Sequence, residues 1–94
     1  FLYLENNNIK YLHELSFSSL VKVNLINLNN NRIDILNKEF MNLTKLEKLY
    51  LSNNPLASLS NIGKLIKKLD LSQTNINFEI FFLINDLNNL LDLD

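Results

Sequence analysis

Few of the side chains that enzymes use for chemistry occur in this sequence, and those that occur are scattered. One histidine, His13, one glycine and no cysteine are present, which excludes a cysteine nucleophile, a thiolate metal site and a glycine-rich phosphate loop. A lone histidine is far more often structural than catalytic. Carboxylates come singly apart from Asp92 and Asp94, so no pair is placed for acid–base work. We therefore expect no enzymatic activity, no bound metal and no cofactor.

The charge and hydropathy patterns exclude two further classes of function. Nine basic and ten acidic residues give a net charge of -1 and are spread along the chain, without the basic stripe that a nucleic acid needs. The longest unbroken apolar run, residues 80–84, is far shorter than the roughly 20 residues that span a bilayer. We expect neither a nucleic-acid partner nor membrane insertion by this chain.

One short string recurs four times and must position the remaining side chains. Its pattern is an apolar residue, any residue and leucine, followed by two polar residues, an asparagine or threonine, one further residue and an apolar residue. The four copies begin at Leu2, Ile26, Leu49 and Leu69, and a fifth begins at Leu93. In each copy the first and third residues point to one side of a strand. One strand cannot cover its own apolar face, so parallel neighbours must stack to bury it.

These strings resemble the leucine-rich-repeat consensus LxxLxLxxNxL along the whole chain and are closest to the typical 24-residue class. The resemblance implies one domain, residues 1–94, with four units and the start of a fifth that begin near residues 1, 23, 46, 66 and 90. It implies an α/β solenoid, a right-handed horseshoe segment with a short-stranded parallel sheet on the concave face and loops or short helices on the convex face. Because both ends fall inside a unit, we expect a fragment of a longer solenoid.

An asparagine recurs where the chain leaves each strand and turns inward. Buried backbone groups lose their sheet partners there, and a carboxamide offers two donors and an acceptor to replace them. We therefore predict an internal ladder of Asn7, Asn31 and Asn54. Thr74 holds the fourth place with only a hydroxyl, so its rung is predicted to be weaker. The other asparagines, which bring the total to 18, we attribute to a drift in composition.

The segments that return the chain from one strand to the next carry their own patterns. Phe17 and Phe40 recur at matching places and are predicted to stack as a spine under the outer face. Residues 76–87 place apolar side chains at helical spacing, which predicts a short helix. Gly63 lies in a shortened third return, where a tight turn can require a positive φ.

The side chains that alternate with the inward leucines line the concave sheet face. With strands about 4.8 Å apart, Tyr3 and Tyr50 would stand roughly 10 Å from one another on this face. Exposed tyrosines among small polar groups are typical of protein-contact surfaces, because tyrosine offers a large contact area at low entropic cost. The predicted partner-binding residues are Tyr3, Leu25, Asn27, Lys48, Tyr50, Lys68 and Asp70.

The sequence is compatible with two functions. Both rest on the same repeat geometry, and in both the partner is a protein. The resemblance implies a recognition module similar to the ectodomains of animal innate-immune or adhesion receptors, secreted or at the cell surface. The alternative is a cytoplasmic scaffold similar to the phosphatase-regulating repeat proteins. Asn42 begins an N-glycosylation sequon with Leu43 and Thr44, and a glycan there would favour the receptor-like function.

Overall fold

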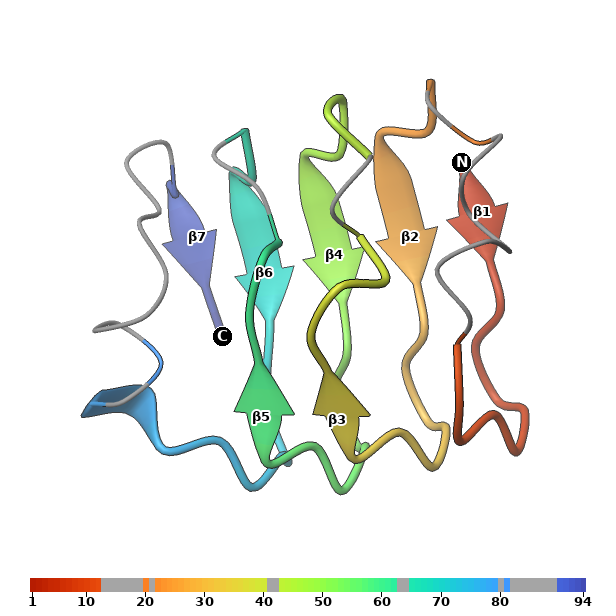
Figure 1. Ribbon diagram of the computed structural model, residues 1–94, viewed down its shortest axis with the longest axis vertical. Coiled ribbons are helices and arrows are strands. Elements are labelled where there is room, and N and C mark those ends of the chain that lie inside the picture. Colours follow the sequence, from red (N-terminus) through yellow and green to blue (C-terminus); the bar gives the residue numbers. More distant parts are fainter. Residues whose placement is uncertain (13–19, 21, 41–42, 63–64, 80, 82–89) are drawn as a thin grey trace.

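A parallel sheet of five short strands is the main element of the chain. The computed structural model describes residues 1–12, 20, 22–40, 43–62, 65–79, 81 and 90–94. Within them, the strands of this sheet follow one another in chain order (Figure 1). They are β1 (Leu2–Tyr3), β2 (Leu25–Asn27), β4 (Lys48–Tyr50), β6 (Lys68–Asp70) and β7 (Asp92–Leu93). This arrangement confirms the predicted parallel-sheet solenoid.

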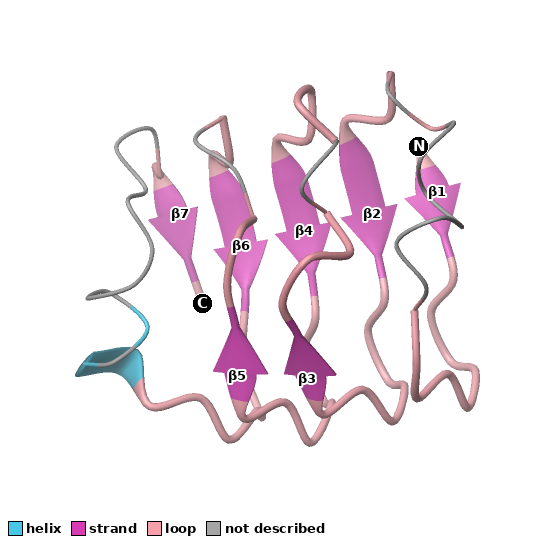
Figure 2. Cartoon of the chain, in the orientation of Figure 1, coloured by secondary structure: helices cyan, strands magenta, loops and turns pink. Residues whose placement is uncertain are grey.

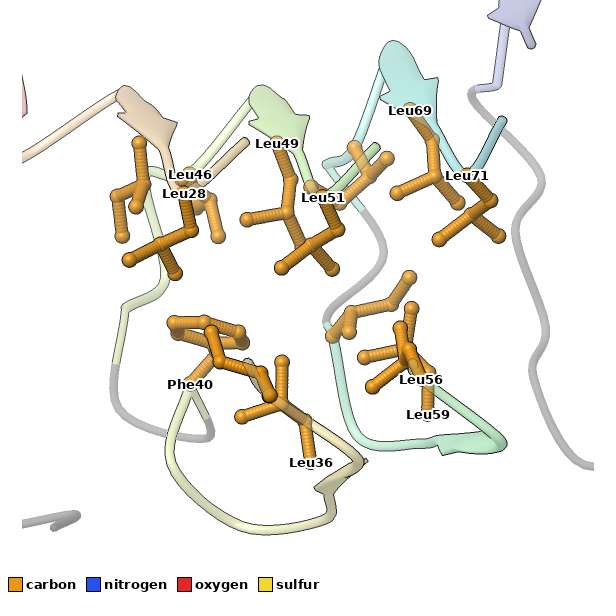
Figure 3. Packing of buried hydrophobic residues seen from close by; sticks show 14 of the residues in the cluster. Leu28, Leu36, Phe40, Leu46, Leu49, Leu51, Leu56, Leu59, Leu69 and Leu71 are labelled. Carbon is orange, nitrogen blue, oxygen red and sulfur yellow. The ribbon is translucent and has the colours of Figure 1, made fainter. Parts of the chain in front are cut away.

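The register of the sheet is the one that the repeated strings predict. Leu2 lies beside Ile26, Ile26 beside Leu49, and Leu49 beside Leu69. A slip of one residue would turn every inward side chain outward, so the apolar pattern specifies this pairing strongly. Figure 3 shows sheet leucines pointing toward apolar side chains of the return segments. Among the described residues, the core side chains with no exposed surface are Ile26, Leu28, Ile33, Leu49, Leu51, Leu56, Ile66 and Leu69.

A second, smaller sheet contributes to the opposite side of this core. It consists of β3 (Ile35–Leu36) and β5 (Ser58–Leu59), which pair in parallel. Figure 3 shows Leu36 and Leu59 directed toward the leucines of the larger sheet. We expected loops or short helices on this side and did not predict the pair, because strands of two residues are too short to show a periodicity.

The return that follows β6 contains helical backbone. Phe78, Glu79 and Phe81 have helical conformation (Figure 2), and the Phe81 N–H donates to the Asn77 carbonyl at 2.9 Å. The buried ring of Phe81, 2% exposed, packs edge-on against that of Phe78 with centroids 6.3 Å apart. Residues 80 and 82–87 of the predicted helix lie outside the described residues.

Other predicted features fall partly or wholly outside the described residues. Phe40 of the predicted spine is buried, with 2% of its surface exposed, whereas Phe17 lies outside them. His13, Asn42 and Gly63 also lie outside. The spine, the glycan site and the glycine turn therefore stay predictions.

Candidate functional site

Buried asparagines hold the turns that follow the strands. The Asn31 Nδ2 donates to the carbonyls of Leu4 and Leu28 at 3.0 Å each, and its Oδ1 accepts from the Ile9 N–H at 3.1 Å. Asn54 makes the equivalent three bonds one unit later. Each carboxamide thus joins its own turn to the preceding unit and satisfies backbone groups that burial would otherwise leave unpaired.

The two outer members of the predicted ladder make fewer bonds. Asn7 is exposed and donates to two carbonyls of its own turn, at 3.1 and 3.2 Å. The Thr74 hydroxyl donates to the Leu71 carbonyl at 2.6 Å. A hydroxyl has one hydrogen, so it cannot also donate to the preceding unit. One unit earlier, the Ile33 N–H donates to the Asn54 Oδ1. The equivalent group, the Leu56 N–H, has no acceptor among the described residues.

A further column of residues adopts a backbone conformation that most residues avoid. Asn6, Asn30, Asn53 and Gln73 each directly precede a ladder position and have φ of 61°, 59°, 55° and 54°. This left-handed region costs an ordinary residue roughly 1–2 kcal/mol, and asparagine is several-fold enriched in it. The attribution of these asparagines to a drift in composition is therefore wrong. Their recurrence before the three ladder asparagines was the signal that could have found them.

The same asparagines form an exposed row of side chains, distinct from the buried ladder. The Asn30 Nδ2 donates to the Asn6 Oδ1 at 2.9 Å, and the Asn53 Nδ2 donates to the Asn30 Oδ1 at 2.7 Å. Each bond crosses from one unit to the next. The row therefore places carboxamides at regular intervals on the surface.

The side chains predicted to bind a partner share the face of the large sheet that points away from the core, because they alternate with the inward leucines. Strand pairing places Asn27 between Tyr3 and Tyr50, and Asp70 beside Tyr50. The neighbouring column carries one apolar and two basic side chains in register. We call this surface the open sheet face, and it consists of Tyr3, Leu25, Asn27, Lys48, Tyr50, Lys68 and Asp70.

Three members of the open sheet face are either held by their own turns or buried. The Asn27 Oδ1 and the Asp70 Oδ1 each accept from the backbone N–H two residues later, at 3.0 Å in both cases. These are Asx turns, in which the side chain closes the turn after its strand. Leu25 occupies its predicted column but is only 9% exposed. Of the seven members, Tyr3 and Lys48 are exposed, whereas Asn27, Tyr50, Lys68 and Asp70 are partly buried.

Aromatic contacts position the two tyrosines of this face. The Lys68 Nζ lies 5.7 Å from the centre of the half-buried Tyr50 ring. Tyr3 is 57% exposed, and its ring meets that of Phe1 edge-on with centroids 6.2 Å apart. A cation–π contact at an exposed site contributes about 0.5–1 kcal/mol. Both rings are thus partly ordered before any partner arrives, which lowers the entropic cost of binding.

The ion pairs of the described residues join neighbouring units. Lys67 and Glu47 approach to 3.5 Å and Lys68 and Asp92 to 3.6 Å, with side chains between 38% and 53% exposed. Pairs this exposed contribute about 0–1 kcal/mol each. In the described part of the chain, no three His, Cys, Asp or Glu side chains group closely enough to hold a metal ion. That part also contains no helix of the length and hydropathy needed to cross a membrane.

Comparison with known protein families agrees with this geometry. The family model described as "Leucine rich repeat" matches residues 2–56, which is more than half of the chain. The match contains β1, β2 and β4 together with Asn7, Asn31 and Asn54. No curated protein and no solved structure gives a significant match.

Proposed function

The chain belongs to the leucine-rich-repeat family, whose members serve as general protein-interaction modules and are usually non-catalytic, and on this premise we propose that it binds a protein partner through the open sheet face. The observation that supports this face is the register that brings Tyr3 and Tyr50 together with Lys48 and Lys68 beside them. A few aromatic anchors among polar neighbours contribute most of the energy at protein interfaces.

The finer role is that of a receptor-like recognition module of innate immunity or adhesion, secreted or at the cell surface. Its supports are the likeness of the first units to the typical 24-residue class and the sequon at Asn42. The second candidate is a cytoplasmic regulatory scaffold, similar to the phosphatase-regulating repeat proteins. The shortened third unit, which departs from the typical class, favours that candidate.

A glycan at Asn42 separates these two roles. Mass spectrometry of the natural protein, before and after enzymatic removal of N-linked glycans, is expected to assign a glycan to Asn42 if the protein is receptor-like. An unmodified protein in the cytoplasmic fraction would contradict that role and support the scaffold. Neither result alters the proposed binding face.

The binding face itself is tested by truncating its central anchor. Affinity capture with the chain as bait identifies a partner, whose affinity is then measured by titration. Tyr50→Ala is expected to weaken binding about 30-fold, because truncating an aromatic anchor costs about 2 kcal/mol. Ile35→Ala is the matched control, since Ile35 is 61% exposed and belongs to the small sheet. Unchanged affinity of the Tyr50→Ala chain would contradict the proposal.

A further inference from the structure

A polar groove lies along the turns that follow β1, β2, β4 and β6. Its volume is about 470 Å³ and it opens broadly to solvent, a size within the range of ligand-binding clefts. Eight of its ten lining residues are asparagine or glutamine, and the other two are Arg32 and Pro55. In Figure 1 these turns form the lower edge, just beyond the arrowheads of the strands. The groove is therefore distinct from the open sheet face.

Arg32 makes the groove electropositive. No carboxylate lines the groove, and among the described residues no acidic side chain pairs with the Arg32 guanidinium. The backbone at this position is held in place, because the Arg32 N–H donates to the Ile9 carbonyl at 2.8 Å. A guanidinium carries five donors in a planar fork and no acceptor. The groove thus presents a permanent positive charge on an anchored backbone, and the donors of this group are available to a ligand.

The carboxamides add further donors at regular intervals. Asn30 and Asn53 each use one Nδ2 hydrogen in the exposed row, which leaves each with a second hydrogen. The side chains of Asn8 and Gln73 form no hydrogen bond to the described residues. The units repeat at the strand spacing of about 4.8 Å. Donors therefore extend along the groove across several units.

The combination of carboxamides, which carry both donors and acceptors, with one guanidinium and no carboxylate indicates the chemistry of the ligand. An extended peptide offers one backbone carbonyl per residue, and an aspartate or glutamate side chain can accept two parallel bonds from Arg32. A nucleic acid fits poorly, because one cation neutralises little of a phosphate backbone. Small-molecule sites are mostly apolar and enclosed, unlike this open groove lined by carboxamides.

We propose that this groove binds an acidic peptide segment in an extended conformation. Arg32 holds a carboxylate of the peptide, and the free Nδ2 hydrogens of Asn30 and Asn53 hold its backbone carbonyls. The ladder beneath the groove fixes these turns in advance through the bonds of Asn31 and Asn54 to the core backbone. Peptide binding here does not require the tyrosines of the open sheet face.

Fluorescence anisotropy tests this site, with the full chain and a fluorescein-labelled hexapeptide of alternating aspartate and serine. Arg32→Gln is expected to weaken binding at least about tenfold, the usual loss when a charge-assisted hydrogen bond is removed. Asn53→Gly removes a carboxamide, yet suits the positive φ of 55° at that position. It is expected to weaken binding about threefold, as for a neutral hydrogen bond.

Lys48→Gln is the matched control, since it removes the same charge from the open sheet face. It is expected to leave peptide affinity unchanged, as is Tyr50→Ala. Equal losses for Arg32→Gln and Lys48→Gln would overturn the proposal. So would equal binding of a peptide with asparagine for aspartate, a comparison that needs no variant and holds even if Arg32→Gln does not fold. Tighter binding of an oligogalacturonate of equal charge would assign the groove to an acidic glycan instead.

Discussion

Adjacent asparagines perform different tasks at the scale of single residues. Asn53 lies on the surface with a φ of 55°, and its side chain donates to the carboxamide of the preceding unit in the exposed row. Asn54 is buried and bonds to backbone of its own turn and of the preceding one. One residue type suits both places because a short carboxamide tolerates left-handed backbone and carries donors and an acceptor together. Thr74 has only a hydroxyl, so it can form only some of the hydrogen bonds that a ladder asparagine forms.

Restoring a carboxamide at the fourth ladder position is expected to stabilise the chain. In Thr74→Asn the new side chain can donate to the Leu51 carbonyl and accept from the Leu56 N–H, as Asn54 does one unit earlier. The free energy of unfolding, measured in urea, is expected to rise by about 1 kcal/mol. Amide exchange at Leu56, expected to be faster than at Ile33 in the unsubstituted chain, should slow.

Thr74→Val is the control for this substitution. It keeps the shape of the side chain but removes the hydroxyl that donates to the Leu71 carbonyl, so a loss of about 1 kcal/mol is expected. If Thr74→Asn lowers stability, or leaves exchange at Leu56 as fast as before, the ladder does not extend to this position as we describe it.

At the scale of elements, two unequal sheets enclose the core. Each strand of the small sheet has only two residues, of which the first is exposed and the second is buried. Leu36 and Leu59 point inward and are each 1% exposed, while Ile35 is 61% exposed. Backbone bonds flank the pair, with the Ala57 N–H donating to the Asp34 carbonyl at 2.9 Å. The small sheet is therefore a part of the core and not only a connection.

Substitutions on the inward and the outward side of the small sheet are expected to differ in their effect on stability. Leu59→Ala leaves a cavity under the large sheet, so the free energy of unfolding should fall by about 3 kcal/mol. Ile35→Ala changes an exposed neighbour and should cost no more than about 0.5 kcal/mol. Urea unfolding of both variants measures the difference. The slopes of the unfolding free energy against urea concentration are compared as well. Similar losses for the two would mean that the small sheet does not pack on the core.

At the scale of the whole molecule, one row of turns serves both the core and the surface. Asn31 and Asn54 bond to core backbone and also line the groove. The open sheet face lies on strands whose inward residues, such as Leu49 and Leu69, are fully buried. Stability in such a stack is a sum over neighbouring units. Both surfaces are therefore held by the contacts that hold the fold, which favours binding with little reorganisation.

Much of the open sheet face could be predicted from the sequence, whereas its local contacts could not. The columns of Tyr3 and Tyr50 follow from strict alternation along a strand. The Asx turns of Asn27 and Asp70 and the burial of Leu25 depend on neighbouring backbone and side chains. The alternation of residues along a single strand does not reveal these turns or this burial.

The sequence by itself determined the register of the sheet and the identity of its inward residues, since both follow from a period of two within strings that repeat along the chain. Only the tertiary structure decided the β3–β5 pair, the left-handed backbone at Asn30 and Asn53, and the grouping of Arg32 with carboxamides in one groove. The physical reason is that these features depend on dihedral angles and on which residues of different units become neighbours. Both are set when the units stack.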